Sequence, residues 1–342
     1  MKLSIITINY NNAEGLRKTL ASVAAQTYTD IEHIIVDGGS TDGSVEVIRE
    51  YEQTLASSLP PLASRLKWIS EPDKGIYNAM NKGLEIALGK LGVTDDHHST
   101  PLASRLSPNS LSDYIQILNS GDILAADDVT ERMMAALAQQ VRDYRLEVKG
   151  KESSKAETDA SSLLASSLSP IQNRPAILYG NMIKVNAQGQ VVGKSGYTEY
   201  SLRQFYSSTL NHDCAYIRRD LFEEYGLYDE NLKIVSDWKW YLQAIGLGRV
   251  KPEYVDIDVT IFDDGGISET NLALRNAERR QVLEELLPPA VLWDYDTHAF
   301  EMEQMKRLRR WHLYGLVYFL ERGCFKMEKW GVLRQSRTMY DV

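Results

Sequence analysis

The stretches LSIITINYNN (residues 3–12) and IEHIIVDGGSTDG (residues 31–43) decide the fold. Each begins with a short run rich in β-branched residues, which predicts a buried strand, and ends in polar or glycine residues. A helix-like apolar pattern follows each one, as at Leu16, Leu20 and Val23 after the first. Strands that alternate with helices predict an α/β fold with a doubly wound, mainly parallel sheet, whose ligands bind at the carboxyl ends of the strands.

The same order recurs further along the chain. A strand at 67–70 leads through EPDKG into a helix at 76–88, and a strand at 114–118 runs into NSGD at 119–122. Four predicted strands therefore end in polar loops, and we expect these loops to border one cleft. The later predicted elements are a helix at 129–144, a strand at 177–178 and a hairpin of residues 182–185 and 191–194. This second half is typical of an α+β arrangement.

Length and composition fit one catalytic domain with an appendage, since 342 residues with 43% hydrophobic side chains can bury a full core. The 38 basic and 47 acidic residues give a net charge of −9, which disfavours a nucleic-acid partner. Cys214 and Cys324 are too few for a disulfide framework. The first residues do not resemble a signal peptide, and no stretch approaches the roughly 20 apolar residues of a membrane span. We therefore expect a cytoplasmic protein.

The pentad Leu-Ala-Ser-x-Leu occurs at irregular spacing between the predicted elements. Its copies lie at 55–59, 62–66, 102–106 and 164–168. Irregular spacing excludes a solenoid repeat with a shared core. We interpret the copies as loop insertions near 53–66, 92–112 and 150–174, and a partner-binding role is the alternative.

Two aspartates follow predicted strands at the expected cleft. Asp37 ends the second strand before Gly38 and Gly39, which suits a contact with a ribose or base, although an ordinary turn has the same pattern. Asp122 stands at the tip of the loop after the strand at 114–118. A carboxylate there could hold Mg²⁺ or Mn²⁺ against a diphosphate leaving group, and a helix-capping role is the alternative.

A third aspartate, Asp237, begins a predicted helix within IVSDWKWY (residues 234–241). Aromatic rings such as Trp238 can stack on sugars, and a carboxylate beside them can accept a proton from an attacking hydroxyl. We expect partial burial to raise the pKa of Asp237. As an isolated feature, the residue would equally fit a helix N-cap.

Taken together and in order, these motifs resemble glycosyltransferase family 2 over residues 1–270. The opening at 4–11, the block IIVDGGSTDG (residues 34–43) and EPDKGIYNAMNKG (residues 71–83) are similar to the nucleotide half of that family. The resemblance implies a GT-A fold with a nucleotide-binding half at 1–122 and an acceptor-binding half at 123–270.

The resemblance also assigns donor-site residues. It places Asn9, Tyr10 and Asp37 at the base and ribose, and Asp73, Lys74 and Asn81 at the uridine or diphosphate side. The usual Asp-x-Asp motif is represented by NSGD, so its first aspartate is missing and Asp122 alone matches the metal-ligating position. The implied cofactor is Mn²⁺ or Mg²⁺. Lys74 could equally be a solvated side chain.

On the acceptor side, Asp237 falls where the family places its catalytic base, and we expect His212 and Trp238 to bind the acceptor. A loop histidine with a structural hydrogen bond is the alternative for His212. The resemblance implies an inverting transfer from a nucleotide-sugar donor, with UDP the expected nucleotide, to a hydroxyl of a saccharide or lipid-linked acceptor. The expected setting is the biosynthesis of cell-surface polysaccharides. The alternative is a catalytically inactive homologue that binds nucleotide-sugars or acts as a scaffold.

The C-terminal region, residues 271–342, is predicted to be helical. Within it, residues 306–320 carry basic side chains and then aromatic ones, a pattern typical of a segment that lies on anionic lipid at the inner face of the membrane. Packing on the catalytic domain or on a second subunit of a homodimer is the alternative.

Overall fold

The computed structural model describes residues 1–58, 62, 65–93, 99–101, 111–154, 174–186, 188–263, 271–313 and 319. The chain divides into two compact units, Met1–Val282 and Leu283–Val342, and each is considered by itself. Among the described residues, no helix combines the length and the apolar character that crossing a membrane requires.

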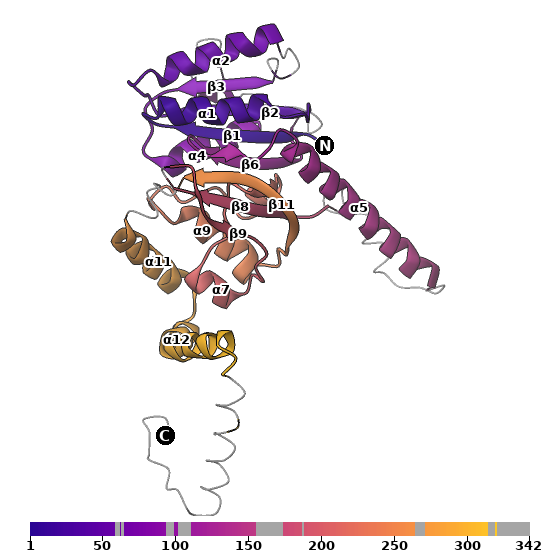
Figure 1. Ribbon diagram of the computed structural model, residues 1–342, viewed down its shortest axis with the longest axis vertical. Coiled ribbons are helices and arrows are strands. Elements are labelled where there is room, and N and C mark those ends of the chain that lie inside the picture. The colour runs from indigo at the N-terminus through magenta and orange to yellow at the C-terminus, as the bar shows by residue number, and fades with distance from the viewer. Residues whose placement is uncertain are drawn as a thin grey trace, which may run out of the picture. The chain divides into compact units, whose positions relative to one another are not determined.

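A nine-stranded mixed sheet organises the described part of the first unit, in the order β3-β2-β1-β6-β10-β8-β11-β7 with β9 paired to β8 (Figure 1). Strands β3, β2, β1 and β6 are mutually parallel, whereas β10 is antiparallel to both of its neighbours. The strands are β1 (Leu3–Asn9), β2 (Ile31–Asp37), β3 (Leu66–Ser70), β6 (Tyr114–Asn119), β7 (Ile123–Leu124), β8 (Ile177–Val185), β9 (Val191–Ser195), β10 (Ala215–Arg218) and β11 (Pro252–Asp263). The predicted α/β fold class is confirmed.

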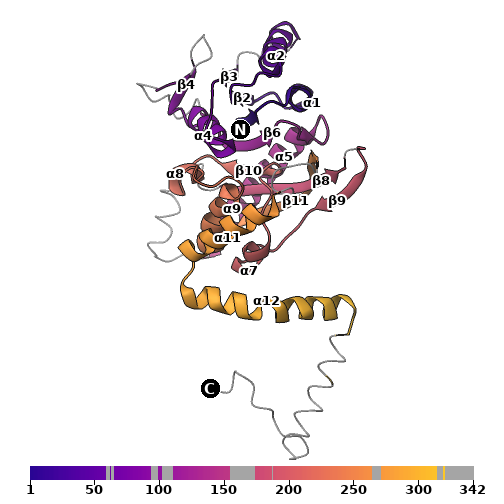
Figure 2. The ribbon, with the colours of Figure 1, turned by 90° about the vertical axis from the view of Figure 1, so that its left-hand side faces the viewer.

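Helices cover both faces of the parallel strands (Figure 2). On one face, α1 and α2 pack on β2 and β3 through residues such as Leu16, Val47 and Trp68. On the other face, α4 lies so close that a Cβ at Gly83 would come within 2.4 Å of the Ile6 side chain. The helices are α1 (Ala13–Ala24), α2 (Ser44–Ser58), α4 (Ile76–Ala87), α5 (Val129–Ser154), α7 (Leu202–Ser207), α8 (Leu221–Glu224), α9 (Ser236–Tyr241), the π-helix η2 (Leu242–Leu247), α11 (Leu272–Leu286) and α12 (Pro289–Arg310).

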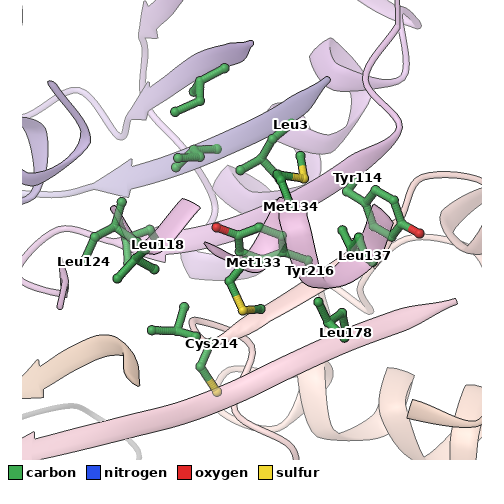
Figure 3. Close-up of a cluster of buried hydrophobic side chains, with 14 of the residues drawn as sticks. Leu3, Tyr114, Leu118, Leu124, Met133, Met134, Leu137, Leu178, Cys214 and Tyr216 are labelled. Atoms are coloured by element: carbon green, nitrogen blue, oxygen red, sulfur yellow. The ribbon is translucent and has the colours of Figure 1, made fainter. Parts of the chain in front are cut away.

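A second apolar cluster joins the two halves of the sheet. Met133, Met134 and Leu137 of α5 pack against Tyr114 of β6 and Tyr216 of β10, and all five side chains are buried (Figure 3). Because β6 belongs to the parallel strands and β10 to the mixed ones, this cluster holds the two halves as one body. The loops at the ends of both sets of strands are therefore fixed relative to each other.

The predicted helices and strands lie where the sequence placed them, with two extensions. Helix α5 continues to Ser154 instead of ending at residue 144. The strand at 177–178 and the first arm of the hairpin at 182–185 are one continuous strand, β8, whose Gly180 backbone passes β11 too closely for a side chain: a Cβ there would lie 2.4 Å from the Ile257 carbonyl oxygen.

The first pentad copies differ from the expected loop. Residues 55–58 are the end of α2, where Leu55 is fully buried, and Leu62 packs against both apolar clusters. Leu66 begins β3. A leucine on the inner face of a helix gains more by burial than in a solvated loop, which is why this segment joins the core.

The copies at 102–106 and 164–168 lie outside the described residues. Next to the first of these, β4 (Leu91–Val93) and β5 (Ser99–Pro101) form a small antiparallel sheet.

The predicted division of the chain after residue 270 stays a prediction. The first compact unit extends to Val282, so the beginning of α11 belongs to it. Glu278 is the reason, because its carboxylate accepts the backbone N–H groups of Lys233 (2.7 Å) and Ile234 (2.9 Å).

Candidate active site

One cleft of about 1180 Å³ gathers most of the predicted site residues. One side of it is lined by Asn9, Tyr10 and Asp73, and the opposite side by His212 and Asp237. Asn119, Ser120, Gly121 and Asp122 also line it. The cleft lies where the parallel strands end, as the alternation of strands and helices predicted.

Asp37 differs from its expected role in ligand contact. It is fully buried, and it does not line the cleft. Its Oδ1 accepts hydrogen bonds from Asn9 Nδ2 (2.8 Å) and Ser40 Oγ (2.6 Å), and its Oδ2 accepts from Ser40 N (2.9 Å) and Ser70 Oγ (2.7 Å). A carboxylate with four donors is fully occupied, so Asp37 ties together the ends of β1, β2 and β3.

Asn9 presents a free acceptor to the cleft. While its Nδ2 binds Asp37, its Oδ1 is buried with no hydrogen-bond partner. Tyr10, 65% exposed, stands beside it as an aromatic face. Asp73 closes the same wall, where a Cβ at Gly38 would come within 2.4 Å of its Oδ2. A glycine at 38 therefore lets the two loops approach.

Lys74 and Asn81 do not line the cleft. The Lys74 side chain is exposed, which agrees with the solvated alternative. Asn81 is buried, and its amide accepts from Tyr228 N (3.0 Å) and donates to Tyr228 O (2.8 Å) and to Glu230 Oε1 (2.9 Å). It satisfies the backbone of a turn in the acceptor half and thereby ties α4 to that turn.

Asp122 is held at the cleft by its own loop. Thr19 of α1 accepts the Gly121 N–H (2.9 Å) and donates to the Asp122 carbonyl (2.8 Å). The Asp122 side chain is 5% exposed, and its Oδ2 is buried without a hydrogen-bond partner. Burial, with the nearby charge of Asp213, raises the pKa of Asp122 to about 8.

Such a carboxylate fits a divalent cation, because an orphaned, desolvated oxygen gains most from a positive charge. Among the described residues, no three His, Cys, Asp or Glu side chains gather as a metal site. A cation at Asp122 would therefore need further oxygen ligands from a bound diphosphate, which is the chemistry that the resemblance implies.

His212 connects the Asp122 loop to Asp237. Its Nδ1 lies 3.1 Å from Asp237 Oδ2, and its Nε2 lies 3.1 Å from the amide nitrogen of Asn119. The second Asp237 oxygen, Oδ1, accepts from the Tyr77 hydroxyl at 2.8 Å. Both oxygens of Asp237 thus have a donor, so the orientation of its carboxylate is fixed.

These contacts set the charges. For His212, burial opposes the cation, but the hydrogen bond and the charge of Asp237, with Asp213 and Asp122, raise its pKa to about 9. A protonated His212 donates from both nitrogens, so Nε2 would then need an acceptor, and a rotated Asn119 amide would supply its Oδ1, which has no hydrogen-bond partner in the present orientation.

Contrary to the expectation from the sequence, the pKa of Asp237 is lowered. Burial alone would raise it, but the hydrogen bond and charge of His212 and the Tyr77 hydroxyl outweigh that effect. Asp237 is therefore an oriented carboxylate at neutral pH. The N-cap position of α9 is occupied by Val235 and not by Asp237.

The Trp238 side chain is mostly enclosed by the protein. It is 1% exposed, its Nε1 donates to Phe205 O (2.8 Å), and the guanidinium carbon of Arg279 lies 5.0 Å from the centre of its ring. Trp238 does not line the cleft but lines a smaller cavity beside it, and its acceptor role stays a prediction. A tryptophan at the start of a helix can face the core as readily as the cleft, and the sequence does not distinguish these orientations.

Sequence reasoning missed Tyr77, Asn119 and Asp213 as site residues. Tyr77 and Asn119 stand inside the motifs EPDKGIYNAMNKG and NSGD. Their position in these cleft-forming loops was the only indication in the sequence that they could belong to the site. Their partners lie far along the chain, 160 residues away for Tyr77 and 93 for Asn119. Only the folded chain reveals these pairs.

Comparison with known proteins agrees with the motifs. Residues 4–108 match the model of the family described as Glycosyl transferase family 2. An uncharacterized glycosyltransferase of Mycobacterium tuberculosis is 43% identical over 90 residues, which are 26% of this chain and 30% of that protein. A PGL/p-HBAD biosynthesis glycosyltransferase of Mycobacterium bovis is 23% identical over 269 residues, 78% of this chain and 79% of the relative.

Among solved structures, S. aureus TarS 1–349 in complex with UDP has a TM-score of 0.49 at 15% identity, covering 87% of this chain and 74% of that one. The alignment with the M. tuberculosis relative covers less than a third of the length of that protein, and the match to the family model ends at residue 108. Over residues 4–108, the chain is similar to glycosyl transferase family 2, in agreement with the resemblance of its motifs.

Proposed function

We propose that this protein is a nucleotide-sugar-dependent glycosyltransferase that transfers a sugar with inversion to an acceptor hydroxyl. The observation that carries the proposal is the chain of contacts from Asn119 through His212 to Asp237, which joins the loop of the proposed metal ligand to an oriented carboxylate across one cleft. The match of residues 4–108 to the model of a glycosyltransferase family supports it.

The donor nucleotide would occupy the side of the cleft formed by Asn9, Tyr10 and Asp73. Asn9 Oδ1 is a buried acceptor without a partner, suited to an N–H or hydroxyl of a base or ribose, and Tyr10 is an exposed ring on which a base can stack. Asp37 supports this wall from behind by fixing Asn9.

Asp122 would hold Mn²⁺ or Mg²⁺ together with the diphosphate of the donor. When bound, the cation stabilises the negative charge that grows on the nucleoside diphosphate as the glycosidic bond breaks. For this, the protein supplies the buried carboxylate of Asp122, in a loop that Thr19 holds through two hydrogen bonds.

Asp237 would be the catalytic base. Its low pKa keeps it ionised, so it can accept the proton of the acceptor hydroxyl as that oxygen attacks the anomeric carbon from the face opposite the leaving diphosphate. His212 and Tyr77 act through Asp237 as positioning residues, since each binds one of its oxygens. A single base opposite the leaving group is the arrangement of an inverting transfer.

A panel of nucleotide-sugars with Mn²⁺ or Mg²⁺, monitored for release of nucleoside diphosphate, tests the proposal. One donor should be hydrolysed slowly without acceptor and faster with a saccharide or lipid-linked acceptor, and the product should have the inverted anomeric configuration by NMR. Binding of donors without any release would instead support the inactive, nucleotide-sugar-binding homologue.

The proposed setting is the biosynthesis of cell-surface glycans at the inner face of a membrane. The printed name of the M. bovis relative, a PGL/p-HBAD biosynthesis glycosyltransferase, supports a role in glycan assembly. In the second unit, Trp311 (64% exposed) and Phe319 (73% exposed) follow Arg307, Arg309 and Arg310 at the end of α12, in agreement with a surface that touches lipid. A homodimer contact through this unit is the alternative.

A further inference from the structure

A second, smaller cavity of about 170 Å³ shares one wall with the proposed active site. Asn119, Asp122, His212 and Asp237 line both cavities. The nucleotide-side residues Asn9, Tyr10 and Asp73 line only the larger one. The smaller cavity therefore lies on the side of Asp237 away from the proposed nucleotide site, where an acceptor would enter.

Cationic side chains distinguish the far wall of this second cavity. Lys184 of β8 and both Arg275 and Arg279 of α11 line it. The arginines are four residues apart on one helix, so their guanidinium groups lie on the same face and repel each other. Two like charges held together at a cavity wall are stabilised by an anion between them.

The charged form of the Arg279 guanidinium is destabilised in this cavity wall. Burial, and then the charge of Arg275, lower its pKa from the ordinary value of an arginine. Its Nε is buried without a hydrogen-bond partner, and its guanidinium is held over the ring of Trp238. A desolvated guanidinium with an unused donor gains strongly from a bound oxyanion.

The acidic side chains of the same cavity already have other contacts. Asp213 Oδ2 accepts from the Thr260 hydroxyl (2.6 Å), and Asp237 is bound by His212 and Tyr77. Asp122 is the proposed cation ligand. These groups form the wall shared with the active site or lie next to it, whereas the arginines come from a different element, α11.

The position of α11 relative to Asp237 is fixed. Glu278, 7% exposed, accepts the backbone N–H groups of Lys233 and Ile234, four and three residues before Asp237. Because Glu278 precedes Arg279 directly, an anion at Arg279 would sit at a set distance from the proposed base. A cation wall placed in this way can orient an acceptor as well as attract it.

We propose that the second cavity binds an oxyanion carried by the acceptor, a phosphate ester or a carboxylate, through Arg275, Arg279 and Lys184. The proposal rests on the function proposed above and names the acceptor class for it. Acceptors that bear such a group next to the reacting hydroxyl would be favoured over neutral saccharides.

Binding can be measured without turnover. Phenyl phosphate and, separately, benzoate are titrated calorimetrically into the full chain in EDTA, first alone and then with saturating UDP. We expect one of the two anions to bind in both conditions, and the better one identifies the phosphate or carboxylate class. Arg279→Gln should weaken this binding about tenfold to a hundredfold, while Arg279→Lys should retain most of it.

The matched control is Arg280→Gln, on the same helix but exposed and outside the cavity. It should leave anion binding unchanged. Equal binding by wild type and a folded Arg279→Gln variant would overturn the proposal, as would failure of both anions to bind or displacement of the anion by UDP, which would assign the cavity to the donor.

The donor-hydrolysis panel separates this inference from the proposed function. If a donor is hydrolysed but neither anion binds at Arg279, the glycosyltransferase proposal stands and the anionic acceptor is wrong. If an anion binds at Arg279 but no donor is hydrolysed, the anion site stands and the glycosyltransferase proposal fails.

Discussion

The two sides of the cleft proposed above as its donor wall and its acceptor wall are built in different ways. On the donor wall, Asn9, Asp37 and Ser70 stand in register at the ends of adjacent parallel strands, so hydrogen bonding of the sheet brings them together. On the acceptor wall, His212 precedes a strand and Asp237 begins a short helix, and only their side chains join them. The donor wall should therefore tolerate changes that uncouple the acceptor wall, and five predictions probe this difference.

The largest expected effect is that of Asp237→Asn. The amide cannot accept the hydroxyl proton, so transfer to the acceptor should fall about 10²–10⁴-fold. Nucleotide affinity, measured by calorimetry, should stay nearly unchanged because the donor wall is intact. Near-normal transfer by this variant would eliminate the base assignment.

Asp122→Asn should reduce metal-stimulated turnover roughly 10²–10³-fold, because a neutral amide does not supply the charge that holds a cation against a diphosphate. Circular dichroism should show an unchanged fold. Unlike Asp237→Asn, this variant should also lose the metal-dependent part of its nucleotide affinity. A wild-type response of turnover to Mn²⁺ or Mg²⁺ would contradict the ligand role.

Asn81→Ala tests whether Asn81 joins the two halves of the unit, as its contacts with Tyr228 indicate, or binds the donor, as the resemblance implies. It leaves the Tyr228 N–H and carbonyl unsatisfied, which should cost about 1–3 kcal/mol of unfolding free energy. Affinity for UDP should change by less than about threefold, because Asn81 does not line the cleft. Asn78→Ala, which removes a contact with Glu230 in a more exposed position, is the control. A selective loss of UDP binding would restore the donor-site reading.

The pairing of His212 with Asp237 should make stability depend on pH. The pKa of His212 is raised from 6.5 to about 9, so its contribution is fully present below pH 6.5 and is lost as the pH rises through 9. The lowered pKa of Asp237 makes its own contribution present above 3.8 and lost as the pH falls further.

The free energies of unfolding of wild type and His212→Gln, measured by thermal denaturation, should therefore differ most between about pH 4 and 6.5, by on the order of 1–3 kcal/mol, and converge as the pH rises through 9. A difference that stays constant from pH 5 to above pH 9 would show that His212 is neutral in the folded protein.

The effect expected to be smallest for each residue changed concerns the second compact unit. Replacing Arg307, Arg309 and Arg310 by glutamine should weaken sedimentation with anionic liposomes by about 1 kcal/mol per residue, and salt should weaken it in the intact protein. The control replaces Arg17, Lys18 and Arg49 of the first unit. Equal liposome binding by the two triple variants would defeat the membrane proposal, and a smaller oligomer on removal of residues 306–342 would favour the subunit contact.

Much of the donor wall could be predicted from the sequence. Asn9 and Asp73 line the cleft as expected because they follow strands directly, and neighbouring parallel strands must end at one edge of the sheet. Asp37 shows the limit. Its position at the end of a strand was evident, but whether its carboxylate points to ligand or to Asn9 and Ser70 depends on packing against β3.

Local pattern determined the strands, the helices and the polar loops, because alternation of apolar and polar residues depends only on neighbours along the chain. It also placed Asp122 and Asp237 at loop and helix ends. The tertiary structure alone decided that His212 joins Asp237 to Asn119, that Tyr77 fixes the same carboxylate, and that Arg279 covers Trp238. These contacts join residues far apart in the chain, and the charge and orientation of a buried group follow from whichever partners the fold brings to it.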